Sequence, residues 1–106
     1  MQDEEKNFEK IFIEAVDEAL MVLGESGKHM VFFHLEKSYS IKKDEIPKKP
    51  ETFITGLRKI FGSGATVLEK LILENLCSKL GLQYERKDDY TLVDYLNYIK
   101  SQAKVE

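Results

Sequence analysis

Residues 50–81 read PETFITGLRKIFGSGATVLEKLILENLCSKLG, and this stretch decides the fold class. Pro50 stands at a position favoured in the first turn of a helix, and the helical apolar pattern that follows it ends at Gly62. A second helical pattern covers residues 64–80 and ends at Gly81. We therefore predict two helices joined by a tight glycine corner. The apolar residues that define them are Phe53, Ile54, Leu57, Ile60 and Phe61, then Leu68, Leu71, Ile72, Leu76 and Leu80.

The second of these helices is unusually apolar. Val67, Leu73 and Cys77 widen its stripe until most of its circumference is apolar. A helix of this kind lies at the centre of a core or is covered by a second chain. We expect self-association on this basis, with a two-fold dimer as the default oligomer. Ser63 is the expected N-cap of the helix.

Two segments before this stretch also carry apolar residues at helical spacing. Residues 4–23 form the first, which Gly24 ends. Residues 27–39 form the second, with Ser26 as the expected N-cap. The apolar run at 30–35 also fits a buried strand, but the cap and the charged residues that follow it favour a helix. The predicted inward-facing residues are Phe8, Phe12, Ala15, Val16, Ala19, Leu20 and Leu23, then Val31, Phe32 and Leu35.

The connecting segments are polar and short. Residues 41–49 form one connector, in which Ile46-Pro47 is predicted to be an extended anchor. Leu82 is expected to fold back onto the last apolar turn of the 64–80 helix in a Schellman-type contact. The charged stretch at 83–90 is predicted to be extended.

The start of the last helix is well defined by its sequence. Thr91 and Asp94 have the spacing of a capping box, and Tyr90 and Tyr95 stand at the positions of a hydrophobic staple. The chain shows no internal repeat and no Gly/Ser linker. We therefore predict an all-α protein, a compact bundle of about five helices, with residues 1–106 as a single domain. The inward-facing residues of the last helix are predicted to be Leu92, Leu96, Ile99 and Ala103.

Composition excludes several functional classes. The net charge is −3, so the chain has no overall attraction for nucleic acid. The longest apolar run, residues 30–33, is far too short to span a bilayer, and the acidic N-terminus does not resemble a signal peptide. Cys77, the single cysteine, is expected to be an inert core thiol in a reducing compartment. We expect a cytoplasmic protein that does not engage membranes and needs no cofactor.

Neither histidines nor acids are spaced for a metal site. His29 and His34 are about 140° apart on a helix, so they cannot chelate one ion together. We predict that His34 is a partly buried, hydrogen-bonded residue. Glu14, Asp17 and Glu18 share a helix face opposite the apolar stripe, and we predict a solvated face rather than a cation site. We therefore expect a metal-free protein.

The glycine corner is the most distinctive local motif. The free amides of Gly62, Ser63 and Gly64 at a helix start could bind an anion, but a P-loop would need a Gly-Lys-Ser/Thr ending and a preceding strand. We favour a structural corner in which Gly62 takes a positive φ. These three residues and His34 remain the candidate contacts for an anion or a partner.

Nearby lysines are interleaved with acids, which makes a poor nucleic-acid surface. They are Lys37, Lys42, Lys43, Lys48 and Lys49.

The run HLEKSYSIKKDEIPKKPETFITGLRKIFGSGATVLEKLILENLCSKLGL, residues 34–82, resembles an archaeal domain family, the Nitrosopumilus output domain. The likeness covers residues 8–99, and the glycine corner is its most specific part. The matching positions are His34-Leu35-Glu36, Glu45-Ile46-Pro47, Phe53, Phe61, Gly62, Gly64, Ala65, Glu69, Lys70 and Lys79-Leu80-Gly81.

This resemblance implies an archaeal, cytoplasmic, all-helical domain that occurs alone or attached to signal-transduction modules. Such domains are outputs that contact another macromolecule, and the resemblance supplies no catalytic residue.

Our first hypothesis is a non-enzymatic, self-associating protein-interaction module, because the chain has more apolar positions than its core needs. The alternative is a nucleic-acid-binding regulator in which the glycine corner acts like a helix-turn-helix. An anion sensor or enzyme using Gly62-Ser63-Gly64, with Glu69, Lys70 or His34, ranks last. The extra apolar positions are Ile11, Met21, Val22, Met30 and Phe33.

Overall fold

The computed structural model describes residues 2–85 and 90–104, and it describes side chains over residues 7–85 and 90–101. Five α-helices and three short 3₁₀ segments account for most of the described chain, which holds no strand. The predicted all-α class and the five helices are confirmed. The elements are α1 (Gln2–Leu20), η1 (Met21–Leu23), α2 (Gly24–Tyr39), η2 (Lys43–Lys48), α3 (Pro50–Phe61), η3 (Gly62–Gly64), α4 (Ala65–Leu80) and α5 (Leu92–Lys104).

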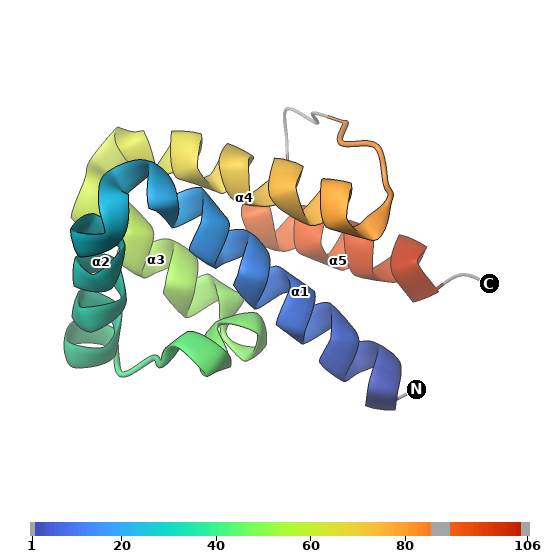
Figure 1. Cartoon of the computed structure of the whole chain (residues 1–106), viewed down its shortest axis with the longest axis horizontal. Helices are drawn as coiled ribbons and strands as arrows, with labels where there is room; N and C mark the ends of the chain where they lie inside the picture. The colour runs from blue at the N-terminus through green and yellow to red at the C-terminus, as the bar shows by residue number, and fades with distance from the viewer. Residues whose placement is uncertain (1, 86–89, 105–106) are drawn as a thin grey trace.

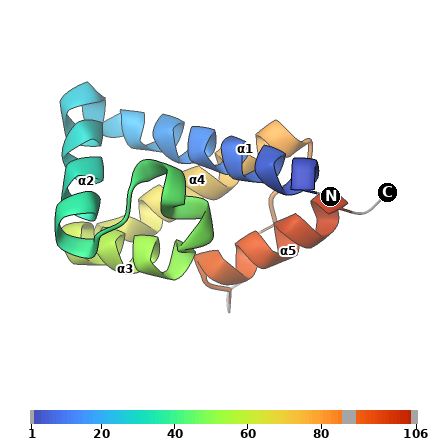
Figure 2. The same ribbon diagram turned by 90° about the horizontal axis from the view of Figure 1, so that it is seen from below.

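The helices are arranged with α2 and α5 at opposite ends of the molecule (Figure 1). α1 lies against α4 along the middle, and α3 lies below them (Figures 1 and 2). None of the helices in the described part of the chain has the length and apolar character needed to cross a membrane.

α4 is the central helix of the core. Leu68, Ile72 and Leu76 are buried on one side, and Leu73 and Cys77 are buried beyond them. The wide apolar stripe of this helix is therefore covered by the chain itself, and it does not require a second chain. Val67, which is 62% exposed, is the exception among the residues that widened the stripe.

Small residues on α1 allow it to approach α4 closely. Ala15 and Ala19 are buried between larger apolar neighbours on the same face, Phe12, Val16 and Leu20. The Nδ2 atom of Asn75 on α4 lies 3.4 Å from the backbone oxygen of Ala15 and donates a hydrogen bond to it.

Several predicted helix ends are confirmed. Gly62 and Gly81 follow α3 and α4 with φ angles of +57° and +72°, which favour glycine. The backbone N–H of Leu82 donates to the carbonyl of Cys77 at 2.8 Å, as the Schellman-type contact requires. The capping box of Thr91 and Asp94 forms both of its hydrogen bonds, and the Tyr90 and Tyr95 rings lie 5.2 Å apart.

The predicted N-caps at Ser26 and Ser63 are wrong. Gly24, with a φ of +81°, turns the chain directly after η1, so α2 begins at Gly24 and Ser26 lies inside its first turn. Ser63 lies in the 3₁₀ turn η3, and α4 has no side-chain cap. In both places a glycine turn makes the reversal, and no serine oxygen is needed to begin the next helix.

The connector after α2 is a 3₁₀ segment, not the extended anchor that was predicted for Ile46-Pro47. A Glu45 side-chain oxygen accepts a hydrogen bond from the Lys42 backbone N–H at 2.9 Å, and this closes the turn. Pro47 fits inside the segment because its fixed φ is compatible with a helical turn. Ile46 is buried, so its role as an anchor holds.

Of the predicted extended stretch at 83–90, residues 86–89 lie outside the described part of the chain, as does the Ala103 side chain.

Candidate functional site

His34, the predicted half-buried histidine, is exposed on α2. The prediction of partial burial is wrong because its side of the helix faces a surface groove. Its ring lies 6.1 Å from the ring of Phe33, edge to face. His34 and Phe61 both line this groove, and Phe61 directly precedes the glycine corner. Gly62, Ser63 and Gly64 are exposed beyond it and do not line it.

The groove lies between α2 and the end of α3 and has a volume of about 280 Å³. Its walls are almost entirely apolar, so it suits an inserted apolar side chain. His34 contributes the titratable side chain among otherwise apolar walls. The lining residues are Leu23, Gly27, Met30, Val31, His34, Ile60 and Phe61.

Gly27 lines the groove at its contact with η1. A Cβ added to this residue would lie 2.7 Å from the Cβ of Leu23, which is closer than real side chains approach. η1 and the first turn of α2 are therefore in close contact here. Val31, one turn further along, is buried and forms part of the apolar wall.

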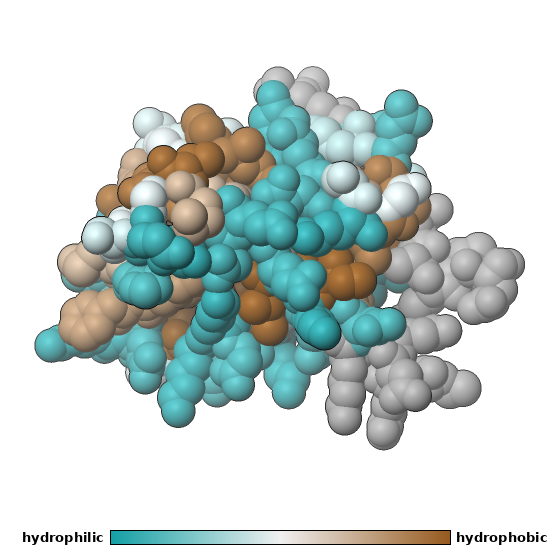
Figure 3. All heavy atoms as spheres, in the orientation of Figure 1, coloured by the Kyte–Doolittle hydropathy of each residue, from teal (hydrophilic) through white to brown (hydrophobic). Residues whose placement is uncertain are grey.

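Large apolar side chains surround the groove and face solvent. Phe33 and Met30 on α2 are 55% and 54% exposed, and all three residues of η1 are exposed. Figure 3 shows apolar surface gathered at this end of the molecule, whereas a hydrophilic surface covers much of the middle. A group of exposed apolar side chains beside a groove is typical of an interaction site. We call it the η1–α2 surface; its residues are Met21, Val22, Leu23, Met30 and Phe33.

The acidic cluster on α1 is paired with lysines from other elements. Lys28 Nζ lies 2.8 Å from Asp17 Oδ1, and Lys43 bonds the other Asp17 oxygen. Lys79 Nζ lies 2.8 Å from Glu18 and 3.9 Å from Glu14. The predicted solvated face is therefore wrong for Asp17, whose side chain is only 24% exposed.

Two opposing effects act on the pKa of the Asp17 carboxyl. Burial alone would raise the pKa of its carboxyl, but hydrogen bonds and positive charge from Lys28 and Lys43 outweigh burial and lower the pKa. The carboxylate therefore joins α1 to α2 and η2 as a charged group. Within the described ranges, no group of three or more His, Cys, Asp or Glu side chains is arranged to hold a metal ion.

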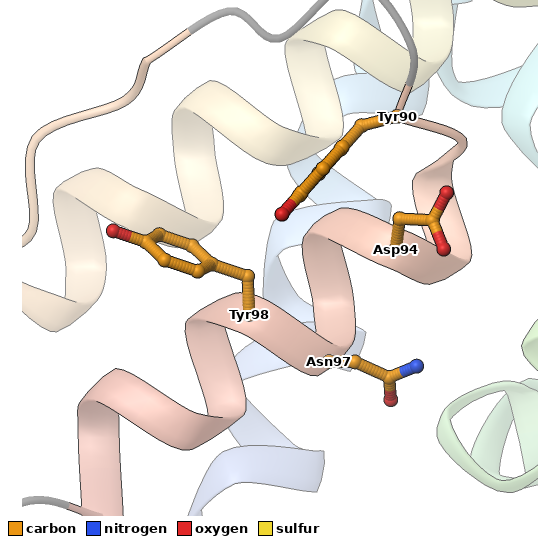
Figure 4. Close-up of a pocket in the computed structure, with 4 residues that line it drawn as sticks. All are labelled: Tyr90, Asp94, Asn97 and Tyr98. Carbon is orange, nitrogen blue, oxygen red and sulfur yellow. The ribbon is translucent and has the colours of Figure 1, made fainter.

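A second hollow lies on α5, at the other end of the molecule. It has a volume of about 470 Å³ and is lined by Tyr90, Asp94, Asn97 and Tyr98. Figure 4 shows the two tyrosine rings on one side of α5, while Asp94 and Asn97 project elsewhere. The Asp94 carboxylate accepts a hydrogen bond from the Thr91 backbone in the capping box. These side chains do not converge on a common point, so the hollow has no defined binding geometry.

Sequence reasoning identified part of the surface and missed the rest. Met21, Val22, Met30 and Phe33 were predicted as apolar residues in excess of the core. The inward-facing prediction for Leu23 is wrong, because η1 leaves its side chain 37% exposed. Ile60 and Phe61 were predicted only as core residues of α3, yet each is half-buried and lines the groove. The sequence did not lead us to predict Gly27 as a groove residue. A glycine next to an apolar stripe was the signal that could have identified it.

The chain was compared with protein-family models, with curated proteins and with solved structures, and no match was found. The resemblance to the Nitrosopumilus output domain therefore stays a prediction.

Proposed function

We propose that this chain is a non-enzymatic interaction module that contacts another protein chain through the η1–α2 surface. The observation that carries the proposal is the pairing of exposed Phe33 and Met30 with an adjoining apolar groove. Exposed aromatic and methionine side chains beside a pocket are the usual anchors of protein interfaces. A role as a signalling output agrees with the family that the sequence resembles.

The chemistry of the groove supports binding over catalysis. His34 lies among apolar side chains, and the groove lining supplies no carboxylate to orient it as a general base. Cys77 is 3% exposed, and burial raises the pKa of its thiol, which disfavours the reactive thiolate.

The nucleic-acid alternative is not favoured by the geometry of the glycine corner. A recognition helix must present a polar face to the major groove. α4, the second helix of the corner, is the central core helix, with Leu68, Ile72 and Leu76 buried. The neighbouring basic residue Arg58 is bonded to Glu69, at 3.2 Å from Nε to Oε2.

Affinity capture from the source organism tests the proposal when it compares matched variants. Tagged wild-type chain, Phe33→Asp and Tyr98→Asp are used as baits, and captured chains, including copies of the bait, are quantified by mass spectrometry. Tyr98 is 41% exposed on α5, far from the η1–α2 surface, so its variant controls for the loss of an exposed aromatic ring.

We expect a stoichiometric protein that binds wild type and Tyr98→Asp but not Phe33→Asp. Equal capture by all three baits would reject the η1–α2 surface as the interaction site. Nucleic acid that co-purifies with all three baits would instead favour the alternative function.

A further inference from the structure

The solvent face of α2 carries a stripe with the spacing of a helix–helix seam. Ser26, Met30, Phe33 and Lys37 follow one another at intervals of four, three and four residues. This is the alternation of the a and d positions of helices that pair side by side. The seam lies away from Val31 and Leu35, which face the core. One helix face therefore serves the fold, and a second is available for pairing.

The same face of α2 carries both an exposed aromatic side chain and part of the groove lining. Phe33 lies three residues after Met30, and Gly27, which lines the groove, lies three residues before Met30. In an antiparallel pair of α2 helices with the two-fold axis at Met30, Phe33 of each copy lies opposite Gly27 of the other. Each copy then presents one aromatic ring and receives one, as an isologous contact requires.

The apolar area is sufficient for a small interface. Fully burying a large apolar side chain removes roughly 60–120 Å² of apolar surface. Five half-exposed residues of the η1–α2 surface, together with the groove walls, therefore supply on the order of 300 Å² per copy. A specific interface at the small end buries about 600 Å² per partner, slightly more than half of it apolar. An interface of this size is typical of a weak, transient dimer.

The geometry points to a second copy of this chain as an occupant of the η1–α2 surface, held in a two-fold dimer by antiparallel α2 helices. This inference rests on the proposed function, since it names the partner of the same surface. The sequence predicted self-association through α4. Because the chain itself covers α4, we now place the contact between copies on α2. The dimer is tested on the purified chain alone, whereas the proposed function is tested by capture of any protein chain from the source organism.

Sedimentation velocity over concentrations from about 1 μM to about 1 mM measures the self-association. We expect the mass to rise from the 12.3 kDa monomer toward twice that value. Phe33→Asp should raise the dissociation constant about tenfold or more, and Tyr98→Asp should leave it unchanged. Circular dichroism melts check that both variants fold. A monomer at every concentration, or a dimer that Phe33→Asp does not weaken, would overturn the inference. The proposed function would still be supported if a different protein were captured through Phe33.

Oxidative cross-linking tests the position of the axis. A cysteine at a two-fold axis faces its own copy, so Met30→Cys should form an interchain disulfide under mild oxidation. Thr55→Cys, exposed on α3, is the matched control and should cross-link much more slowly. The native Cys77 is buried and present in both variants. Equal cross-linking rates for the two variants would overturn the two-fold at Met30.

Discussion

The Cδ2 atom of Leu35 lies 2.5 Å from the position that a Cβ on Gly56 would occupy, so α2 and α3 contact each other through a glycine. Tyr39 Cδ2 is also close to that position, at 3.4 Å. Gly56 lies inside a helix, where glycine is unfavourable by about 1 kcal/mol relative to alanine. Its presence there is explained by the close approach of the two helices. This contact sets the orientation of α2, and hence of the η1–α2 surface.

Gly56→Ala should lower the stability of the protein in spite of its better helix propensity. The added methyl group must displace Leu35, which is fully buried, and overpacking of this kind costs about 1–3 kcal/mol. The better helix propensity offsets about 1 kcal/mol of this cost, so we expect a net loss of up to about 2 kcal/mol in the free energy of unfolding, measured by urea denaturation. Thr55→Ala, at an exposed position of the same helix, is the control and should not be destabilised. An unchanged or higher stability of Gly56→Ala would contradict the close contact.

Gly62→Ala should be destabilising for a conformational reason alone. Gly62 has a φ of +57°, and an added Cβ would meet no atom within 4 Å. The cost is therefore the backbone strain of an L-residue in a conformation that favours glycine, about 1–3 kcal/mol. Gly64→Ala is a matched control two residues away, because Gly64 has a helical φ of −64° and an added Cβ would have room. Coincident thermal melts of the two variants would show that Gly62 does not make the turn.

Asp17→Asn should lower stability at neutral pH and should remove part of the acid sensitivity. The pKa of Asp17 is lowered in the folded state, so its stabilising effect is present above the ordinary aspartate pKa of about 3.9 and is lost as the pH falls below it. The stability difference between parent and variant should therefore shrink below about pH 4.

Urea denaturation from pH 7 down to pH 3 measures this convergence. Asp44→Asn, at an exposed position on η2, controls for the loss of one carboxylate. A constant difference between parent and Asp17→Asn across the range would argue against the linkage to Lys28 and Lys43.

Cys77 should be protected from thiol reagents in the native protein. Its side chain is 3% exposed, and burial raises its pKa, so little thiolate forms at neutral pH. Labelling should then require opening of the core and should be slower than in the urea-unfolded chain by about a thousandfold or more. The introduced thiol of Thr55→Cys, exposed on α3, should react rapidly under the same conditions. Rapid native labelling of Cys77 in the parent chain would mean that α4 is not the covered central helix.

The sequence by itself determined the helices and most of their ends. Helical apolar spacing, the glycines after α3 and α4, and the Thr91–Asp94 capping box depend on residues close in the chain, so local chemistry suffices to predict them. The two serine caps failed because a glycine turn at positive φ or a 3₁₀ turn can begin a helix without a side-chain oxygen. Propensity for a cap does not establish that the cap is used.

Only the tertiary structure decided which apolar residues are covered. α4 and α2 both carry apolar residues in excess of a single stripe, but α4 is enclosed by its neighbours and α2 lies at one end of the molecule. Leu73 is therefore buried and Phe33 is exposed, although both are large apolar residues on helices. Burial depends on contacts between segments distant in the chain, and the order of residues along one helix does not encode them. The groove beside His34 exists for the same reason, because α2 and the end of α3 form it together.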